Sequence, residues 1–245
     1  AFRRAENFFW AVRCHLHTIT RRAEDRLTFD LQREVAARMQ FADRPGKSAV
    51  ERFMQYFFLQ AKRVGHLTGL FLAQLDDQFA KKQPKGLLAG FRARRRMVKG
   101  YPVFGGRINV PSETWFAEDP ARLIEIFVLA DAHGLELHPD AMRLAVQDAR
   151  LVDSVRTDPR ANALFLELLT SRNDPENALR WFNEAGVFGR FIPDFGRVNA
   201  QMQFDMYHHY TVDEHTIRAI GLMARIEKGE MKADHPLATT IVHKV

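Results

Sequence analysis

The stretch SAVERFMQYFFLQAKRVGHLTGLFLAQLDDQF, residues 48–79, predicts one long helix. Ser48 and Glu51 have the spacing of a capping box, in which two side chains bind backbone amides that the first turn of a helix leaves unpaired. The segment KKQPKG, which follows at residues 81–86, contains the proline and glycine that end helices. The sequence as a whole indicates a mainly α-helical fold.

The segment that precedes this helix carries a second helical pattern. Its apolar residues recur at alternating steps of three and four, which places them on one side of a helix. They are Phe2, Ala5, Phe9, Val12, Leu16 and Ile19. Another face carries Arg13, His17 and Arg21 at steps of four residues. This face is either a solvated basic surface paired with Glu6 or Glu24, or a stripe that faces phosphate oxygens, which suit arginine side chains.

Only one part of the chain has a clear strand pattern. Two apolar runs in YPVFGGRINV, residues 101–110, flank Gly105 and Gly106. A Gly-Gly link suits the positive backbone dihedral angles of a two-residue hairpin turn. We therefore expect one short β-hairpin near residues 101–110 in a chain that otherwise forms helical bundles.

The part of the chain that follows the hairpin is divided by signals for helix starts and helix ends. A proline after an aspartate predicts a helix start, because the carboxylate accepts bonds from free amides and proline tolerates the first helical position. Such pairs begin at Asp119, Asp158 and Asp174. Glycine favours the position just past a helix, and Gly134 and Gly186 lie where helix ends are expected. We expect three or four short helices packed as a bundle.

Composition limits the classes of protein to which the chain can belong. The 245 residues carry a net charge of +6 and include one cysteine, Cys14, so an internal disulfide is excluded and a reducing, cytoplasmic compartment is expected. No apolar run reaches the length of a membrane span, so no membrane partner is expected. Arginines cluster in FRARRRMVKG, residues 91–100, which is typical either of a solvated helix end or of a surface that binds nucleic acid.

The two ends of the chain predict that it is a fragment. AFRRAENFFWAVRC, residues 1–14, already follows a helical pattern without a start signal, and ATTIVHKV, residues 238–245, stops without a cap. We therefore expect part of the function to depend on residues outside this sequence.

A run near the C-terminus, MYHHYTVDEHTIRAIG at residues 206–221, contains three histidines. Thr211 and Glu214 have the capping-box spacing, which predicts a helix that starts near Val212 and places His215 in its first turn. His215 then shares a helix face with three apolar residues. These are Ala219, Leu222 and Ile226. His215 is therefore either a core histidine bonded to a carbonyl group or a metal ligand directed at a buried site.

Several long blocks of the sequence resemble one enzyme family. They are WAVRCHLHTIT, RAEDRLTFDLQ, ADRPGKSAVERFMQYFFLQAK, HGLELHPDAMRL, NEAGVFGRFIPDFGR and MQFDMYHHYTVDEHTIRAIG. Over essentially the whole chain, they resemble the bifunctional uridylyltransferase/uridylyl-removing enzymes of bacterial nitrogen signalling. The resemblance implies a helical region after an absent nucleotidyltransferase domain at 1–85, a hairpin with a helical bundle that links domains at 86–199, and the N-terminal part of an HD phosphohydrolase domain at 200–245.

The resemblance implies two opposed reactions in the full-length enzyme. UMP is transferred from UTP to a tyrosine of the PII signalling protein, and the HD domain removes it by hydrolysis, with glutamine as the effector that sets which reaction dominates. A divalent metal, Mg²⁺ or Mn²⁺, is expected in both reactions. The motifs of the nucleotidyltransferase active site are absent from the chain, so we expect no catalytic residue, no bound metal and no activity in the fragment alone.

The resemblance also assigns a role to His215. It falls where the HD domain has its first metal-binding histidine, and the ligands that complete the metal site are expected beyond Val245. His208 and His209 are adjacent and face different ways on a regular element, so at most one of them joins His215 on a common metal.

A further assignment concerns the basic face of the first helix. The family has a Gly-Arg pair at the position of Arg21 and Arg22, so the family's arginine corresponds to Arg22, and Arg21 is a departure. In nucleotidyltransferases of this kind the helical region flanks the nucleotide cleft. We therefore predict that Arg13 and Arg22 hold UTP or dock the catalytic domain.

Two other functions are compatible with parts of the sequence. The net charge and the arginines between residues 92 and 96 suit a basic helical module that binds nucleic acid, although no aromatic residues interleave with them. LLTSRNDPENALRWFNEAGVFGRFIPDF, residues 168–195, is loosely similar to the helical arms of tRNA nucleotidyltransferases. The histidine run argues against that second alternative, and nucleic acid is not the expected partner.

Overall fold

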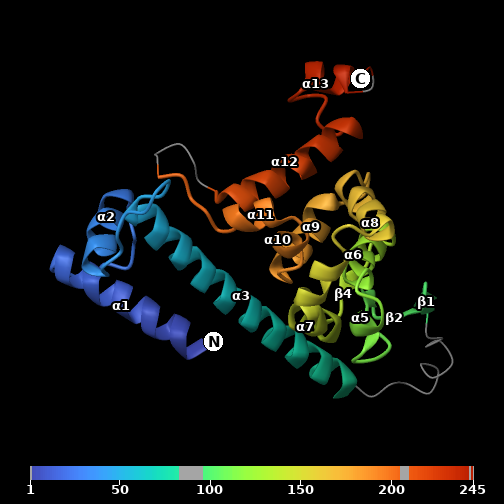
Figure 1. Cartoon of the computed structure of the whole chain (residues 1–245), viewed down its shortest axis with the longest axis horizontal. Helices are drawn as coiled ribbons and strands as arrows, with labels where there is room; N and C mark the ends of the chain where they lie inside the picture. Colours follow the sequence, from blue (N-terminus) through green and yellow to red (C-terminus); the bar gives the residue numbers. More distant parts are fainter. Residues whose placement is uncertain (1, 83–95, 205–209, 243, 245) are drawn as a thin grey trace. The chain divides into compact units, whose positions relative to one another are not determined.

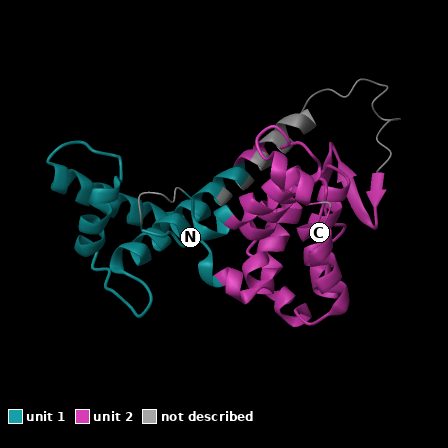
Figure 2. Ribbon diagram, turned by 90° about the horizontal axis from the view of Figure 1, so that it is seen from above, with its two compact units in different colours: residues 1–71, 197–215 teal, residues 72–196, 216–245 magenta. Residues whose placement is uncertain are grey.

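The computed structural model describes residues 2–82, 96–204, 210–242 and 244 (Figure 1). The chain divides into two compact units (Figure 2): unit 1 contains residues 1–71 and 197–215, and unit 2 contains residues 72–196 and 216–245. Helices make up most of the described structure, which has one small sheet, so the predicted mainly α-helical fold is confirmed. None of the described helices is both long enough and apolar enough to span a membrane.

Unit 1 contains helix α1 (Phe2–Thr20), helix α2 (Phe29–Arg38) and the first part of helix α3 (Ala49–Lys82). One core cluster joins them. It consists of Phe8, Val12, Leu16, Val35, Ala36, Val50, Phe53, Met54 and Met202. On α1, Phe8 takes the buried position that the sequence pattern assigned to Phe9, and Phe2 is 55% exposed. The helical period was thus predicted correctly, whereas the buried face is displaced by one residue at that step.

The predicted capping box at the start of α3 is confirmed. The Ser48 amide and hydroxyl donate to one oxygen of the Glu51 carboxylate, at 2.9 and 2.8 Å, and the Glu51 amide donates to the Ser48 hydroxyl at 3.4 Å. The Asp43 carboxylate accepts a further bond from the Ala49 amide at 2.7 Å. These bonds satisfy amides that the helix itself leaves without partners, and they engage both carboxylates.

Unit 2 contains a four-stranded sheet in the order β1-β2-β3-β4. Its strands are β1 (Arg96–Val98), β2 (Tyr101–Phe104), β3 (Arg107–Ile108) and β4 (Glu136–Leu137). The predicted hairpin is confirmed, because β2 and β3 pair antiparallel and Gly105 and Gly106 have φ angles of 55° and 79°. The sequence did not predict β1, which pairs antiparallel with β2, or β4, which pairs parallel with β3. Both strands are too short to show the alternation that identifies a strand.

Most of the remaining described structure is helical. Along the chain the helices are α5 (Trp115–Glu118), α6 (Arg122–Ala132), α7 (Pro139–Asp148), the 3₁₀ helix η1 (Ala149–Val155), α8 (Pro159–Leu169), α9 (Pro175–Glu184), α10 (Phe188–Phe191), α11 (Pro193–Val198), α12 (Val212–Glu227) and α13 (Pro236–Ile241). Helix α6 packs against α8 and α9, and most of its side chains are buried. It therefore forms the centre of the unit 2 bundle.

The predicted helix signals of this bundle are largely confirmed. The carboxylates of Asp158 and Asp174 accept amide bonds inside α8 and α9, which begin at the following prolines. The third Asp-Pro pair, at Asp119, does not directly precede a helix, because α6 begins three residues later, at Arg122. Gly134 and Gly186 have φ angles of 60° and 73° just past α6 and α9, as expected for residues that end helices.

The domain boundaries predicted from the sequence divide the chain into consecutive segments, whereas each unit combines two segments. The boundary between residues 85 and 86 lies outside the described residues, and the boundary between residues 199 and 200 stays a prediction.

Candidate functional site

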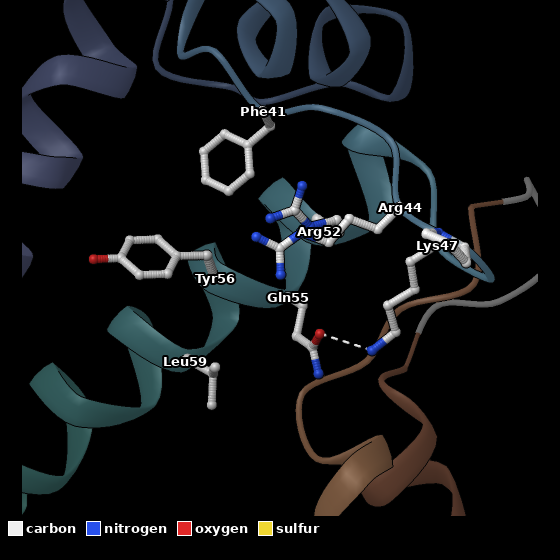
Figure 3. A pocket seen from close by; sticks show the side chains of 8 residues that line it. Phe41, Arg44, Lys47, Arg52, Gln55, Tyr56 and Leu59 are labelled. Atoms are coloured by element: carbon white, nitrogen blue, oxygen red, sulfur yellow. Dashed lines mark hydrogen bonds between the residues drawn. The ribbon is translucent and has the colours of Figure 1, made fainter.

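A pocket in unit 1 lies between the loop that precedes α3 and the first turns of this helix (Figure 3). Its lining residues are Phe41, Arg44, Pro45, Lys47, Arg52, Gln55, Tyr56 and Leu59. The cavity volume of about 380 Å³ is within the range of small-molecule sites, roughly 300–1,000 Å³. Its lining includes three cationic side chains and no acidic one, so this pocket is the candidate site.

A tight turn brings two of the cationic side chains, Arg44 and Lys47, to the pocket. Their backbones exchange two hydrogen bonds, because each amide donates to the carbonyl oxygen of the other residue at 2.9 Å. Residues paired in this way project their side chains on the same side of the backbone. Gly46 lies between them with a φ angle of 79°, which favours glycine. The sequence RPGK therefore fixes two cations on one side of a turn.

One face of α3 forms another wall of the pocket. Arg52, Gln55, Tyr56 and Leu59 are spaced at three and four residues, which places them on the same side of the helix. The Tyr56 ring packs edge-on against Phe8 of α1, with 4.8 Å between the ring centroids. This wall of the pocket is therefore attached to the core of unit 1.

Hydrogen bonds hold two of the cationic side chains in place. Lys47 Nζ donates to Gln55 Oε1 at 2.9 Å (Figure 3), and Arg52 Nη1 donates to the carbonyl oxygen of Ala42. The guanidinium groups of Arg44 and Arg52 extend into the middle of the pocket (Figure 3). Because both acceptors are neutral oxygens, these bonds leave the positive charges uncompensated.

The acidic side chains nearest in sequence form no ion pair with the cations of the pocket in the described structure. Asp43 and Glu51 are engaged by the amides and the hydroxyl group at the start of α3. Within the described residues, Arg44, Lys47 and Arg52 form no ion pair with a carboxylate. Three uncompensated cations around one cavity create a positive potential that attracts an anion.

The arginines that the sequence analysis selected, Arg13 and Arg22, do not line this pocket. Arg13 Nε donates to Asp25 Oδ1 at 2.8 Å, and its guanidinium carbon lies 5.4 Å from the centre of the Trp10 ring. Arg22 Nη2 donates to Glu24 Oε2 at 2.8 Å. The sequence indicated Glu24 as a partner of these basic residues, whereas the ion pair with Asp25 was not predicted. A role of the two arginines in nucleotide binding stays a prediction.

The ion pairs Arg13–Asp25 and Arg22–Glu24 each lower the pKa of the carboxyl group. The hydrogen bond from Arg13 is the main cause that lowers the pKa of Asp25 below its ordinary value of 3.8. The amide of Arg26, followed by the guanidinium of Arg22, lowers the pKa of Glu24 below 4.5. These acids are ionised at neutral pH, so they compensate the positive charge of the α1 face.

His215 lies in the first turn of α12, which begins at Val212 as predicted. Its side chain is exposed, so the predicted inward direction is wrong. The buried residues of α12 are Asp213, Ile217, Gly221, Ala224 and Ile226. Position 215 is about 200° around the helix from position 213, so His215 faces away from Asp213, Ile217, Gly221 and Ala224, whereas Ile226, near the end of the helix, lies close to the face of position 215. The assignment of His215 as a metal ligand stays a prediction.

Asp213 is a buried residue whose role the sequence analysis did not identify. Its carboxylate is fully buried, accepts a bond from the Ala200 amide at 2.9 Å and forms an ion pair with Lys62 Nζ of α3. Lys62 also donates to Asn199 Oδ1 at 3.1 Å, and Gln55 Nε2 donates to the Asn199 carbonyl oxygen at 3.0 Å. These bonds attach the segment around Asn199 to α3 within unit 1.

Comparison with known proteins gives matches along the chain. Residues 1–72 match the family model described as GlnD PII-uridylyltransferase, and residues 101–191 match that of the uridylyltransferase GlnD third domain. The chain is 73% identical to the bifunctional uridylyltransferase/uridylyl-removing enzyme of Novosphingobium aromaticivorans, 68% to that of Erythrobacter litoralis and 52% to that of Rhodospirillum rubrum. Each alignment covers all of this chain. The chain belongs to this GlnD family.

The chain spans about a quarter of the length of these GlnD relatives, 26% or 27% in each. No solved structure matches it significantly. The pocket lies within the segment that matches the GlnD PII-uridylyltransferase model, whereas α6 to α9 lie within the match to the third domain. The comparisons favour neither the nucleic-acid-binding hypothesis nor the tRNA nucleotidyltransferase hypothesis.

The described residues of this GlnD chain do not fit a divalent metal by themselves. Among them, no three His, Cys, Asp or Glu side chains come together as a group that could hold an ion. His215 is a single candidate ligand with an exposed ring. His208 and His209 lie outside the described residues, as do residues 91–95 of the predicted arginine cluster.

Sequence analysis did not predict the pocket, although two signals point to it. RPGK places one cation on each side of a Pro-Gly turn, a spacing that allows both to face the same way. Arg52 and Tyr56 are four residues apart, so a cation and an aromatic ring share one face of the predicted helix. The capping box explained Ser48 and Glu51, which lie between these cations, and no role was assigned to RPGK.

Proposed function

We propose that the chain is the helical segment of an enzyme that transfers UMP from UTP to the PII signalling protein and removes this UMP again. The observation that carries the proposal is the 73% identity over the whole chain to a relative whose name contains both activities. The match of residues 1–72 to a PII-uridylyltransferase model supports PII as the protein substrate. The single cysteine supports a cytoplasmic enzyme.

In this proposal the chain itself contributes no catalytic residue. Enzymes that transfer nucleotides or phosphoryl groups act mainly by positioning the reactants and by stabilising charge. A segment with well-packed helices suits the positioning of domains on either side of it. Arg13 and Arg22 hold UTP or dock the catalytic domain, and glutamine selects the dominant reaction through domains outside the chain.

The removal reaction is proposed to depend on a metal site in the full-length enzyme. His215 is one ligand of a divalent metal, Mg²⁺ or Mn²⁺, whose other ligands lie outside the described residues. The exposed ring of His215 is accessible to such partners. His215→Ala is expected to lower the Mn²⁺ content of the purified full-length enzyme, measured by elemental analysis. An unchanged metal content would contradict this assignment.

The two activities are tested with the full-length enzyme, PII and UTP. Mass spectrometry of PII is expected to show the added mass of UMP on a tyrosine, and glutamine is expected to change which of the two reactions, addition or removal, dominates. A folded enzyme that leaves the mass of PII unchanged in the presence of UTP would contradict the proposed function.

The roles of Arg13 and Arg22 are tested by charge reversal. Arg13→Glu and Arg22→Glu, combined in the full-length enzyme, are expected to raise the KM for UTP or to lower kcat, because both roles require positive charge on α1 and the bend that follows it. Arg38→Glu is a control for charge reversal at one exposed site, since Arg38 is an exposed arginine of unit 1 that pairs with Glu34 on α2. Kinetics equal to those of the control would remove this role.

A further inference from the structure

We propose that the pocket formed by Phe41, Arg44, Lys47, Arg52, Gln55 and Tyr56 binds the triphosphate of UTP. The inference rests on the proposed function, because it assigns to this pocket the nucleotide of the transfer reaction. It differs from the assignment of Arg13 and Arg22, which lie outside the pocket and already have carboxylate partners.

The charge of the pocket points to an anion with several negative charges. Arg44 and Arg52 supply two guanidinium groups, which are suited to bind phosphate oxygens through paired N–H donors. Lys47 adds an ammonium group, which binds phosphate as a point charge. The guanidinium of Arg44 makes no hydrogen bond within the described residues, so its donors are available to a ligand. A triphosphate matches three cations better than a single phosphate does.

The pocket is organised before a ligand binds. Gln55 has both ends of its amide engaged: its oxygen accepts from Lys47 at 2.9 Å, and its nitrogen donates to the Asn199 carbonyl oxygen at 3.0 Å. Gln55 is therefore a positioning residue that holds the ammonium group at the pocket wall. Arg52 is fixed in the same manner by the carbonyl oxygen of Ala42. Side chains that are already ordered lose less conformational freedom when they bind.

Aromatic side chains distinguish this pocket from a site for inorganic phosphate. Phe41 packs edge-on against Phe53, with 5.5 Å between the ring centroids, and the rings of Phe41 and Tyr56 lie 6.1 Å apart. Both rings line the cavity beside the cations. Nucleotide bases stack on aromatic rings of this kind, so the pocket offers surface to the base or ribose as well as to phosphate.

The alternative phosphate source within the same reaction cycle is UMP attached to PII. A phosphodiester carries a single negative charge, which would leave most of the positive charge of the pocket uncompensated. UTP is therefore the ligand that the three cations favour. The two sources predict different results, because one affects the affinity for free nucleotide and the other affects only the removal of UMP from PII.

The proposal is tested by the affinity of the full-length enzyme for UTP, for tripolyphosphate and for uridine, measured by calorimetry. Arg44→Gln and Arg52→Gln are made singly. Each is expected to raise the Kd for UTP and tripolyphosphate about ten- to a hundredfold, since each removes a charge-assisted hydrogen bond. The affinity for uridine is expected to change much less, because uridine carries no phosphate.

Arg38→Gln is the matched control, because it removes the same charge from unit 1 at a site that does not line the pocket. It is expected to bind UTP with the wild-type Kd. The Tm of each variant shows whether it is folded. Arg44→Gln keeps the proposal falsifiable if Arg52→Gln unfolds, since Arg44 makes no side-chain bond to the loop among the described residues.

Two results would overturn the proposal. One is a wild-type Kd for UTP in folded Arg44→Gln, and the other is a loss confined to the removal of UMP from PII. Failure of the proposed function is a separate outcome: a wild-type enzyme that does not modify PII would refute that function, while the UTP affinities of the variants would still decide the assignment of the pocket.

Discussion

Unit 1 holds basic side chains in two different settings. On the exposed surface of α1 and of the bend that follows it, Arg13 and Arg22 bind the carboxylates of Asp25 and Glu24. In the pocket before α3, Lys47 and Arg52 donate to neutral oxygens, and the guanidinium of Arg44 makes no hydrogen bond in the described part of the chain. The two regions carry similar residues, and the difference lies in whether the chain supplies the compensating negative charge.

This difference distinguishes a basic surface, whose cations are paired with carboxylates of the chain, from a basic site that is able to bind an anionic ligand. An exposed ion pair contributes little to stability, and it also occupies the donors that an anionic ligand would need. Cations that lack a carboxylate partner repel one another, so an anion that enters between them removes this repulsion. Periodicity alone led to the α1 face, whereas compensation of charge, which depends on contacts between segments, leads to the pocket.

The largest effect is expected where a compensating carboxylate is buried. Asp213→Ala leaves the Ala200 amide without its acceptor and the Lys62 ammonium group with a neutral partner, Asn199 Oδ1, in place of a carboxylate. Loss of one partner of a fully buried ion pair costs about 3–5 kcal/mol, and the 40% exposure of Lys62 reduces the expected loss to roughly 2–3 kcal/mol. Urea unfolding of the 245-residue chain measures the free energy of unfolding.

Asp213→Asn separates the two contributions. It keeps an oxygen that can accept the Ala200 amide and removes the charge that pairs with Lys62. We expect it to lose less stability than Asp213→Ala. If both variants unfold at the same urea concentration as the wild type, the buried ion pair of Asp213 and Lys62 does not stabilise unit 1. Pairing of cations with carboxylates would then not account for stability in this unit.

A smaller effect on stability is expected at Arg21, which lies in the bend after α1 next to Arg22. Arg21 directly follows the last residue of α1 and has a φ angle of 56°, in the region that favours glycine. Arg21→Gly is expected to raise the free energy of unfolding by roughly 0.5–1 kcal/mol, since the side chain no longer opposes this conformation. Chemical unfolding checks this value.

Arg21→Ala is the control for that change, because it removes the same charge and keeps the Cβ atom. It is expected to bring no gain in stability. A gain of equal size in both variants would show that the positive charge of Arg21, and not its backbone conformation, destabilises the end of α1.

The sequence predicted the elements that local signals define. The capping box of Ser48 and Glu51, the glycine pair of the hairpin and the Asp-Pro starts of α8 and α9 each depend on neighbouring residues. Strands β1 and β4 were missed because their existence depends on pairing with β2 and β3, which no local pattern encodes. The departure at Arg21 from the glycine expected by family resemblance has a physical counterpart in its positive φ angle.

The site was harder to predict because it depends on direction and on partners. His215 was placed in the correct turn of the correct helix, but packing selects the face of Asp213 and Ile217, so the imidazole is exposed. Asp213 is an acid in the first turn of α12, where acids are common, and its buried ion pair depends on Lys62, which is 151 positions earlier in the chain. Neither relation can be obtained from spacing along one helix.

The effect of pH on stability tests the arginines of unit 1 that are paired with carboxylates. Because the folded-state pKa of Asp25 is lowered, its ion pair with Arg13 stabilises the fold above the unfolded-state pKa of Asp25, and this stabilisation is lost as pH falls through the folded-state pKa. Arg13→Gln is expected to raise the pKa of Asp25 toward its ordinary value of 3.8. Carboxyl-carbon NMR during an acid titration measures this shift.

His17→Gln is the control for that titration, since His17 Nε2 lies 3.4 Å from Asp25 Oδ1 and makes the weaker bond. It is expected to change the pKa of Asp25 less than Arg13→Gln does. A pKa of Asp25 that stays low in both variants would contradict the assignment of Arg13 as its main partner.

The smallest effect on stability is expected in the pocket. Arg44→Gln removes a cation with no carboxylate partner in the described structure, so the free energy of unfolding without ligand is expected to stay within about 0.5 kcal/mol of the wild type. Any gain should be larger at low salt, because salt screens the repulsion between the remaining cations. Urea unfolding at low and high salt measures both quantities.

Addition of UTP then shows whether the three cations of the pocket bind a ligand or are only a group of positive charges that the fold tolerates. A ligand that binds the folded state raises its stability according to concentration and affinity, so UTP is expected to raise the Tm of the wild-type full-length enzyme more than that of Arg44→Gln. If Arg44→Gln instead unfolds more easily by over roughly 1 kcal/mol without ligand, its guanidinium stabilises the loop directly. The uncompensated cations would then be structural, and the distinction between the two basic regions of unit 1 would no longer identify a binding site.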